Sequence, residues 1–262
     1  MKTPRRRIPR ATTRAGLVVA VWLVLFILVG GVSSAAADPA GGSLPVAPVA
    51  PQAGAAAPPQ RATPAGAAER SEFERWYEAL PRVTLPVPSD GAAVVIVKFS
   101  DLQCPACSET YVGYRPILAK YQARFPGAIK FITKDYPLQP ECNSHVMRPL
   151  HSAACDAAVA VRLAAKTGKH DALEEWFYTH QALMSPATVR EVASSVGGVS
   201  NFDGQYAAAL AQVKADIGLG GLLGIRSTPT FFINGVRITD VMTPQTFDLA
   251  VAYELRKAGK MK

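Results

Sequence analysis

The stretch AAVVIVKFSDLQCPAC, residues 92–107, joins an apolar run to two cysteines that are separated by two residues. The segment 92–99 is almost wholly apolar, which predicts a buried central strand. The CPAC sequence at 104–107 then places a proline at the first position of the following helix, where its missing N–H costs no hydrogen bond. The stretch therefore predicts a strand that leads directly to a pair of cysteines at the start of a helix.

A pair of cysteines at the start of a helix indicates thiol–disulfide exchange. The unpaired N–H groups and the dipole of the first helical turn favour a thiolate over a thiol, and only the thiolate attacks a disulfide. We expect Cys104 to be the exposed nucleophile with a lowered pKa and Cys107 to be a shielded thiol that resolves a mixed disulfide. Zinc binding is the competing interpretation, but the other two cysteines, Cys142 and Cys155, lack the close spacing typical of a zinc site.

The N-terminus carries most of the net charge of +8, because six basic residues and no acidic residue fall within positions 1–14. Once those six are set aside, 22 of the 28 basic residues remain against 20 acidic ones, so the charge does not indicate a nucleic-acid partner. The uncharged apolar segment 15–32 is at the lower edge of the length that spans a bilayer. We expect a single-pass anchor, with the basic tail inside and the rest of the chain outside the cytoplasm. The alternative is a secretory signal cleaved near the small residues 35–37.

Residues 33–68 are rich in proline, alanine and glycine, which predicts an extended linker without a core. The segment 69–262 is then expected to form one folded domain. It contains all four cysteines, and disulfides persist in exported proteins. We therefore expect a structural disulfide between Cys142 and Cys155. The alternative is that these two cysteines form a second redox pair that relays electrons to the first.

The remaining periodicity predicts a mixed α/β sheet with helices on both faces. An Asn-Gly pair at 234–235 indicates a tight hairpin between the last two strands. The predicted elements, in chain order, are an edge strand at 83–87, a central strand at 92–99, a helix from 104 to 125, a strand at 129–133, a helical insert at about 141–217 whose first helix begins at His151, strands at 228–233 and 236–238, and a last helix that ends at Lys257.

The CPAC sequence and a second sequence, Thr228-Pro229-Thr230 before the predicted hairpin, together resemble the thioredoxin fold of the DsbA-like thiol–disulfide oxidoreductases. The resemblance implies that Thr228–Pro229 is a cis peptide bond packed against the two sulfurs. It also implies that Pro229 belongs to the catalytic centre and that Thr228, Pro105 and Ala106 face the substrate. The pattern around Cys142 and Cys155 is similar, more narrowly, to thioredoxin-like domains associated with vitamin K epoxide reductase-type membrane oxidases.

Two positions depart from the pattern of that family. Ala106 stands where its strongest oxidants carry histidine, so we expect a milder oxidant. Lys98 occupies a strand position where related sequences often carry an acid. This leaves Asp101 and Glu109 as the nearby candidates for the group that accepts the proton of Cys107.

We expect an enzyme that forms disulfides in exported, cysteine-containing proteins and needs no cofactor of its own. The resemblance implies that a quinone-linked membrane oxidase recharges the cysteine pair, and we expect the chain to act as a monomer. One alternative is a reductase or isomerase of the same fold. The other is a non-catalytic module that binds peptides, or a metal through Cys104, Cys107 and either His145 or His151.

Overall fold

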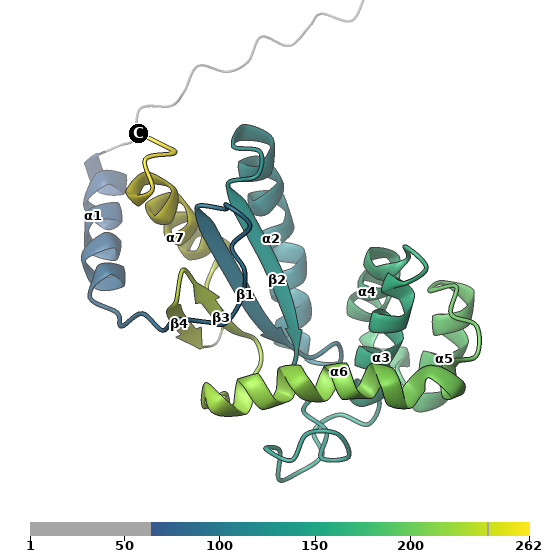
Figure 1. Cartoon of the computed structure of the whole chain (residues 1–262). Helices are drawn as coiled ribbons and strands as arrows, with labels where there is room; N and C mark the ends of the chain where they lie inside the picture. The colour runs from purple at the N-terminus through teal and green to yellow at the C-terminus, as the bar shows by residue number, and fades with distance from the viewer. Residues whose placement is uncertain (1–63, 240) are drawn as a thin grey trace, which may run out of the picture. The chain divides into compact units, whose positions relative to one another are not determined.

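A computed structural model describes residues 64–239 and 241–262 of the chain (Figure 1). The predicted tail at 1–14, the apolar segment at 15–32 and most of the predicted linker lie outside the described residues. Within the described residues, no helix combines the length and the apolar character that crossing a membrane requires.

A four-stranded mixed sheet forms the centre of the domain, with strand order β2-β1-β3-β4. β1 pairs in parallel with β2 and antiparallel with β3, and β3 pairs antiparallel with β4. β1 therefore has a neighbour on each side, as its nearly continuous apolar sequence predicts. The strands are β1 (Val94–Ser100), β2 (Ile129–Asp135), β3 (Thr230–Ile233) and β4 (Val236–Thr239).

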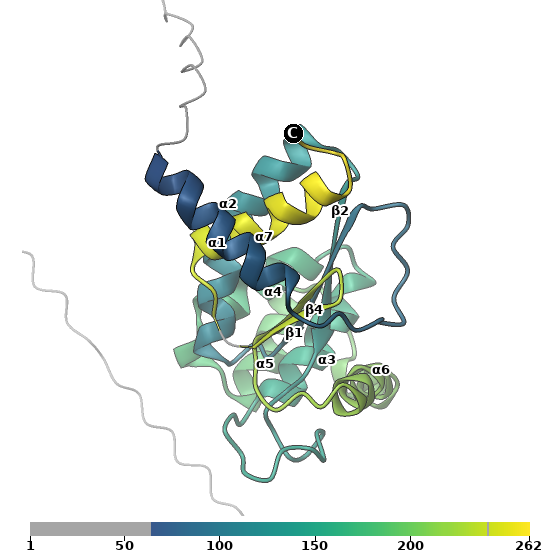
Figure 2. The same cartoon turned by 90° about the vertical axis from the view of Figure 1, so that its left-hand side faces the viewer.

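Helices cover both faces of this sheet, as Figures 1 and 2 show. On one face lie α1 (Pro64–Glu78), α2 (Pro105–Arg124) and α7 (Pro244–Lys257). Across the other face runs α6 (Phe202–Leu222), which contacts β2 and packs against α3. The remaining helices of the insert are α3 (Ala154–Ala165), α4 (His170–Thr179) and α5 (Pro186–Ser195), with a short 3-10 turn at Gln181–Leu183.

The alternation of β1 divides the core into two hydrophobic clusters, since successive side chains of a strand point to opposite faces. Val94 and Ile96 belong to the cluster beneath α1, α2 and α7. Val97 and Phe99 belong to the second cluster, which continues into the helical insert. Lys98 lies on the first face and interrupts its apolar pattern at the end of the strand nearest the cysteines.

Local sequence signals account for several boundaries. Asn234 and Gly235 both have positive φ, and the predicted hairpin between β3 and β4 is confirmed. Ser185 accepts a hydrogen bond from the N–H of Thr188 and begins α5, and Thr243 begins α7 in the same way, each ahead of a proline.

One predicted strand is absent, both ends of the helical insert differ from the prediction, and one helix was missed. The segment 83–87 is not a strand: Arg82 makes one isolated bridge to Val236, and two prolines, at 86 and 88, then remove N–H donors that a ladder would need. The first helix of the insert begins at Ala154 rather than at His151, and the last helix of the insert runs to Leu222 rather than to Ile217. The unpredicted helix is α1, which begins inside the segment interpreted as linker and is held to the domain by Tyr77, a fully buried side chain.

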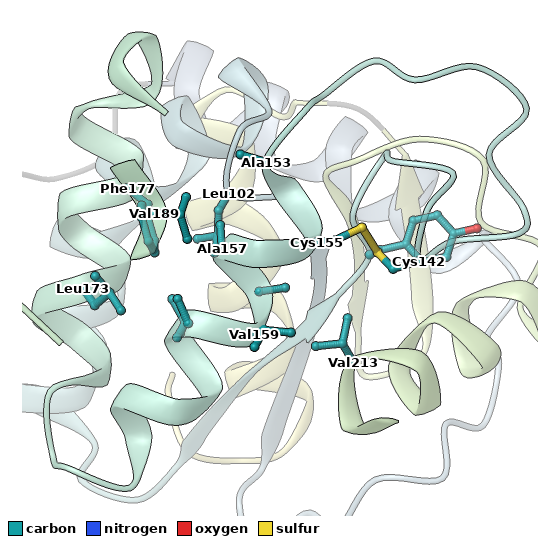
Figure 3. Packing of buried hydrophobic residues seen from close by; sticks show 14 of the residues in the cluster. Leu102, Cys142, Ala153, Cys155, Ala157, Val159, Leu173, Phe177, Val189 and Val213 are labelled. Carbon is teal, nitrogen blue, oxygen red and sulfur yellow. A yellow bond between two sulfur atoms is a disulfide. The ribbon is translucent and has the colours of Figure 1, made fainter. Parts of the chain in front are cut away.

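The helical insert has its own core, drawn in Figure 3. Leu173 and Phe177 of α4, Val189 of α5 and Val213 of α6 pack around the small residues of α3. The disulfide joins Cys142 of the preceding loop to Cys155 of α3, so the predicted pairing is confirmed. It ties the loop 136–153 to the first helix of the insert.

Candidate functional site

The two remaining cysteines are free thiols at the start of α2, directly after β1. Cys104 is the cap residue, with extended backbone dihedrals of −75° and 120°, and Pro105 is the first helical residue. The carbonyl of Cys104 accepts hydrogen bonds from the N–H groups of Cys107 at 3.0 Å and Ser108 at 3.2 Å. Cys107 therefore lies one helical turn beyond Cys104, as the sequence predicts.

Hydrogen bonds within the turn and from the distant Gln181 hold the turn that precedes Cys104. Gln103 donates its N–H to Asp101 Oδ1 at 2.7 Å, and the N–H of Cys104 donates to the Asp101 carbonyl at 3.2 Å. From the far side, the Gln181 amide donates to the carbonyls of Leu102 and Cys104 at 2.8 and 2.9 Å. These contacts satisfy the carbonyls around the cysteine and fix its orientation.

The Thr228–Pro229 peptide bond is cis, as expected from the resemblance. The Cys104 thiol donates a hydrogen bond to the Thr228 carbonyl at 3.3 Å. Residues about 120 positions apart in the chain thus meet at one sulfur, with Thr228 buried and Pro105 and Ala106 at least partly open to solvent. The structure thus brings Thr228, which precedes Pro229, to the cysteine that Pro105 and Ala106 follow.

The expected exposure of Cys104 is wrong, because only 6% of this residue is accessible. The Thr228 carbonyl lies against its sulfur. Its pKa is nevertheless lowered to about 6, first by a hydrogen bond from the Cys107 thiol and also by the side chain of Thr228, while burial and the charge of Asp101 oppose the shift. Cys104 is therefore largely a thiolate at neutral pH.

Cys107 is 0% exposed, and burial raises its pKa well above the usual value for a thiol. The two thiols thus differ in the direction that the sequence predicts. A low-pKa cysteine paired with a protonated neighbour suits a nucleophile and a resolving thiol.

Lys98 is the charged group that faces Cys107 from the sheet. It is only 3% exposed, and its Nζ donates to the Cys107 carbonyl at 3.0 Å. Nζ also lies 5.0 Å from the centre of the Tyr178 ring and 6.0 Å from that of Phe231. Burial lowers the pKa of Lys98, whereas the charge of Cys107 raises it; conversely, Lys98 lowers the pKa of Cys107.

The side chains of the two acids proposed from the sequence as proton acceptors for Cys107 are directed to other partners or to solvent. Glu109 is exposed on α2. The carboxylate of Asp101 is fully buried, and its Oδ2 accepts hydrogen bonds from the N–H of Leu138 at 2.6 Å and from His151 at 2.7 Å. Lys98 instead lies in the wall of a cavity of about 700 Å³ between α2, α4 and the sheet, which is also lined by Glu174 and His170.

Sequence reasoning missed three contributors to this site: Gln181, Tyr178 and the pairing of His151 with Asp101. Tyr178 exchanges a 2.7 Å hydrogen bond with Ser100 and accepts one from Ser108 at its carbonyl, so it ties α4 to both sides of the cysteines. Nothing local marks a glutamine or a tyrosine on an amphipathic helix for such a role. Among the described residues, no group of three or more His, Cys, Asp or Glu side chains is arranged to hold a metal ion.

Comparisons with known proteins agree with this geometry. A sequence model described as thioredoxin matches residues 89–252. The chain is 26% identical over 149 residues to "Na(+)/H(+) antiporter NhaA 3" of Salinispora tropica and 25% identical over 151 residues to "Na(+)/H(+) antiporter NhaA 1" of Mycolicibacterium vanbaalenii. Each match covers 56% of this chain, but the chain spans only 21% and 22% of the length of these relatives.

Among solved structures, alpha-DsbA1 of Wolbachia pipientis is similar over 69% of this chain and 96% of its own, with a TM-score of 0.52 and 17% identity. Oxidised BdbD of Bacillus subtilis is similar over 68% of this chain and 94% of its own, with a TM-score of 0.49 and 22% identity. The first of these similarities shows a shared fold over 69% of this chain. The chain therefore belongs to the thioredoxin family and has the DsbA-like fold, with two free cysteines at the start of α2.

Proposed function

We propose that this chain forms disulfides in exported proteins through Cys104 and Cys107. The observation that carries the proposal is the contrast between the two thiols: the pKa of Cys104 is lowered to about 6, whereas burial raises that of Cys107. A stabilised Cys104 thiolate favours the reduced form of the pair and so makes its disulfide an oxidant. Because Ala106 supplies no additional cation beside the sulfur, we expect a milder oxidant than the strongest members of the family.

The reaction is a pair of thiol–disulfide exchanges. A substrate thiolate attacks Sγ of Cys104 in the oxidised pair, the bond between the two active-site sulfurs breaks, and Cys107 leaves as a thiolate beside Lys98. A second substrate thiolate then attacks the substrate sulfur of the mixed disulfide and releases Cys104. Two electrons pass from the substrate dithiol to the chain, and a membrane oxidase that passes them to quinone would restore the pair.

The region around Thr228 would hold the substrate. Its carbonyl lies 3.3 Å from the Cys104 sulfur, and the adjacent Pro229 has no N–H that could bind the thiolate. Pro105 and Ala106 border the same sulfur from α2. An extended substrate segment placed here would bring its own sulfur to Cys104.

We also propose that the domain is tethered to the outer side of the cell membrane by residues 15–32, through the linker that follows. The uncharged segment and the basic residues before it support this topology. Recovery of a soluble protein that starts at Asp38 would replace the anchor by a cleaved signal.

The test uses the full-length oxidised chain and a reduced, unfolded protein substrate. Cys107→Ser should accumulate a covalent complex through Cys104, whereas Cys104→Ser should form none and should be inactive. The reduction potential of the pair, titrated against glutathione, decides the direction: a potential above that of glutathione supports disulfide formation, and one near that of thioredoxin supports the reductase alternative. Preferential alkylation of Cys107 at neutral pH would overturn the assigned roles.

A further inference from the structure

The fully buried carboxylate of Asp101 lies three residues before Cys104, in the turn that carries the cysteine. An ionised carboxylate without a counter-charge is costly in such a position, and its field opposes the formation of a thiolate nearby. The charge of Asp101 indeed raises the pKa of Cys104. A nucleophile with a lowered pKa next to this group therefore needs something that offsets the carboxylate.

His151 is the cation that the structure places against this carboxylate. Its Nδ1 lies 2.7 Å from Asp101 Oδ2, and 16% of its side chain is accessible. His151 comes from the loop that the Cys142–Cys155 disulfide ties down, and the backbone N–H of nearby Ala153 donates to the Gln103 side chain at 2.6 Å. Together with the N–H of Leu138, which also donates to Asp101, three contacts attach this loop to Asp101 and Gln103 in the turn before Cys104.

The charged groups around His151 are few. From the turn after β1 it faces Asp101, and from the start of α2 it is influenced by the Cys104 thiolate. Burial alone would lower the pKa of His151, but the hydrogen bond and the charge of Asp101 raise it, and the thiolate adds to the rise. Lys98 acts on Cys104 from the sheet side, beyond Cys107.

We infer that His151 is a positioning residue that neutralises Asp101 and so keeps the Cys104 thiolate stable. Neither Pro105 nor Ala106, the residues between the cysteines, carries a positive charge. In this arrangement His151 of the loop 136–153 supplies it instead. The inference deepens the proposed function, because it names the group that sets how strongly the pair oxidises its substrates. It also predicts that oxidising strength falls as pH rises through the titration of His151, since the buried carboxylate is then no longer offset.

The test measures the pH dependence of Cys104 alkylation in the reduced full-length chain, with peptide mass spectrometry to identify the modified cysteine. His151→Gln keeps a hydrogen-bond donor for Asp101 but removes the cation. At pH values below the midpoint of the Cys104 alkylation curve, we expect Cys104 of this variant to be alkylated about tenfold more slowly than in the wild type. The equilibrium constant with glutathione should shift by about the same factor, which corresponds to roughly 30 mV toward a weaker oxidant.

Charge and structure are separated by a double variant. If charge is the cause, Asp101→Asn combined with His151→Gln removes both members of the pair and should return the alkylation midpoint toward the wild-type value. If His151 merely holds the loop in place, the two changes should add. His145→Gln, the same substitution at an exposed position of the same loop, should leave the midpoint unchanged.

The inference is overturned if folded His151→Gln has the wild-type alkylation midpoint. It is also overturned if the midpoint of the double variant lies further from the wild-type value than that of His151→Gln. If His151→Gln does not fold, His151→Lys decides: it keeps a cation and should retain the wild-type midpoint while losing the inflection caused by histidine titration. A raised midpoint in the lysine variant refutes the role of charge. These readouts concern the thiol itself, so they remain interpretable even if the chain turns out to reduce rather than form disulfides.

Discussion

Replacing Lys98 by methionine should not lower the free energy of unfolding, but it should slow the reaction of the oxidised cysteine pair with a substrate thiol. Lys98 is 3% exposed, and the contacts of its ammonium group are a hydrogen bond of 3.0 Å to the Cys107 carbonyl and two aromatic rings within 6.0 Å. A charge-assisted hydrogen bond contributes about 1.5–3 kcal/mol. A desolvated cation–π contact contributes about 2 kcal/mol. Transfer of the ammonium group from water to the protein interior costs several kcal/mol. This cost roughly cancels the stabilisation from the hydrogen bond and the aromatic contacts.

Methionine occupies a similar volume and carries no charge. Because exchange of a buried ion for an apolar residue is often neutral or stabilising, we expect the free energy of unfolding to change by between zero and about +4 kcal/mol. The stability gain of the methionine variant should be largest at neutral pH. Burial lowers the pKa of Lys98, so the wild-type chain becomes more stable as pH rises from this lowered pKa to 10.5, and the difference between the two proteins shrinks.

The catalytic effect should have the opposite sign. Lys98 lowers the pKa of Cys107, which is the leaving thiolate when a substrate attacks Cys104. Loss of a neighbouring cation raises a thiol pKa by at least about one unit, so attack on the oxidised pair should slow by several-fold to about tenfold.

Stopped-flow oxidation of a dithiol peptide and urea unfolding of the oxidised chain measure the two quantities. Lys130→Met on the adjacent strand is the matched control, because Lys130 pairs with the exposed Asp90 and lies away from the cysteines. A Lys98→Met variant that unfolds more easily by 1 kcal/mol or more, yet reacts at the wild-type rate, would refute this account of the buried lysine.

Three further predictions follow from the same contacts. Replacing both Cys142 and Cys155 by serine opens a loop with a sequence separation of 13 and should lower the free energy of unfolding by about 3 kcal/mol in urea titrations; an unchanged stability with lost reoxidation would instead indicate a second redox pair. Arg162→Met leaves Asp135 and the buried Asp216 without their shared partner and should cost about 3–5 kcal/mol at neutral pH. Because burial raises the pKa of Asp135 to about 6 even with Arg162 present, loss of Arg162 should raise it further; the stability loss should therefore shrink as pH falls toward 6 and level off below it, and a pH-independent loss would contradict the assignment. In the wild type, the alkylation rate of Cys104 should rise with pH and pass half its maximum at about pH 6, with the inflection caused by His151 above that midpoint.

Local patterns in the sequence were sufficient to predict the framework. The apolar run at 92–99, the Asn-Gly turn and the proline-initiated helices each act within a few residues, because they depend on strand alternation, backbone dihedrals and missing N–H groups. That the CPAC pair and Thr228–Pro229 belong to one site was implied by the resemblance to DsbA-like oxidoreductases, not by a local pattern. The edge strand at 83–87 failed because pairing depends on what lies beside a segment, and only Arg82 bridges to β4.

The electrostatics of the site depended on the tertiary structure alone. His151 meets Asp101 across 50 positions, and Gln181 reaches the Cys104 carbonyl across 77. Burial of Cys104 and the placement of Lys98 against the Cys107 carbonyl follow from how β1, α2, α4 and the Thr228 segment pack together. The sequence identified the candidate residues of the site, since a cysteine pair at a helix start has few other uses. Their pKa values were decided by packing, because desolvation and charge act through space and over a few ångströms, irrespective of separation along the chain.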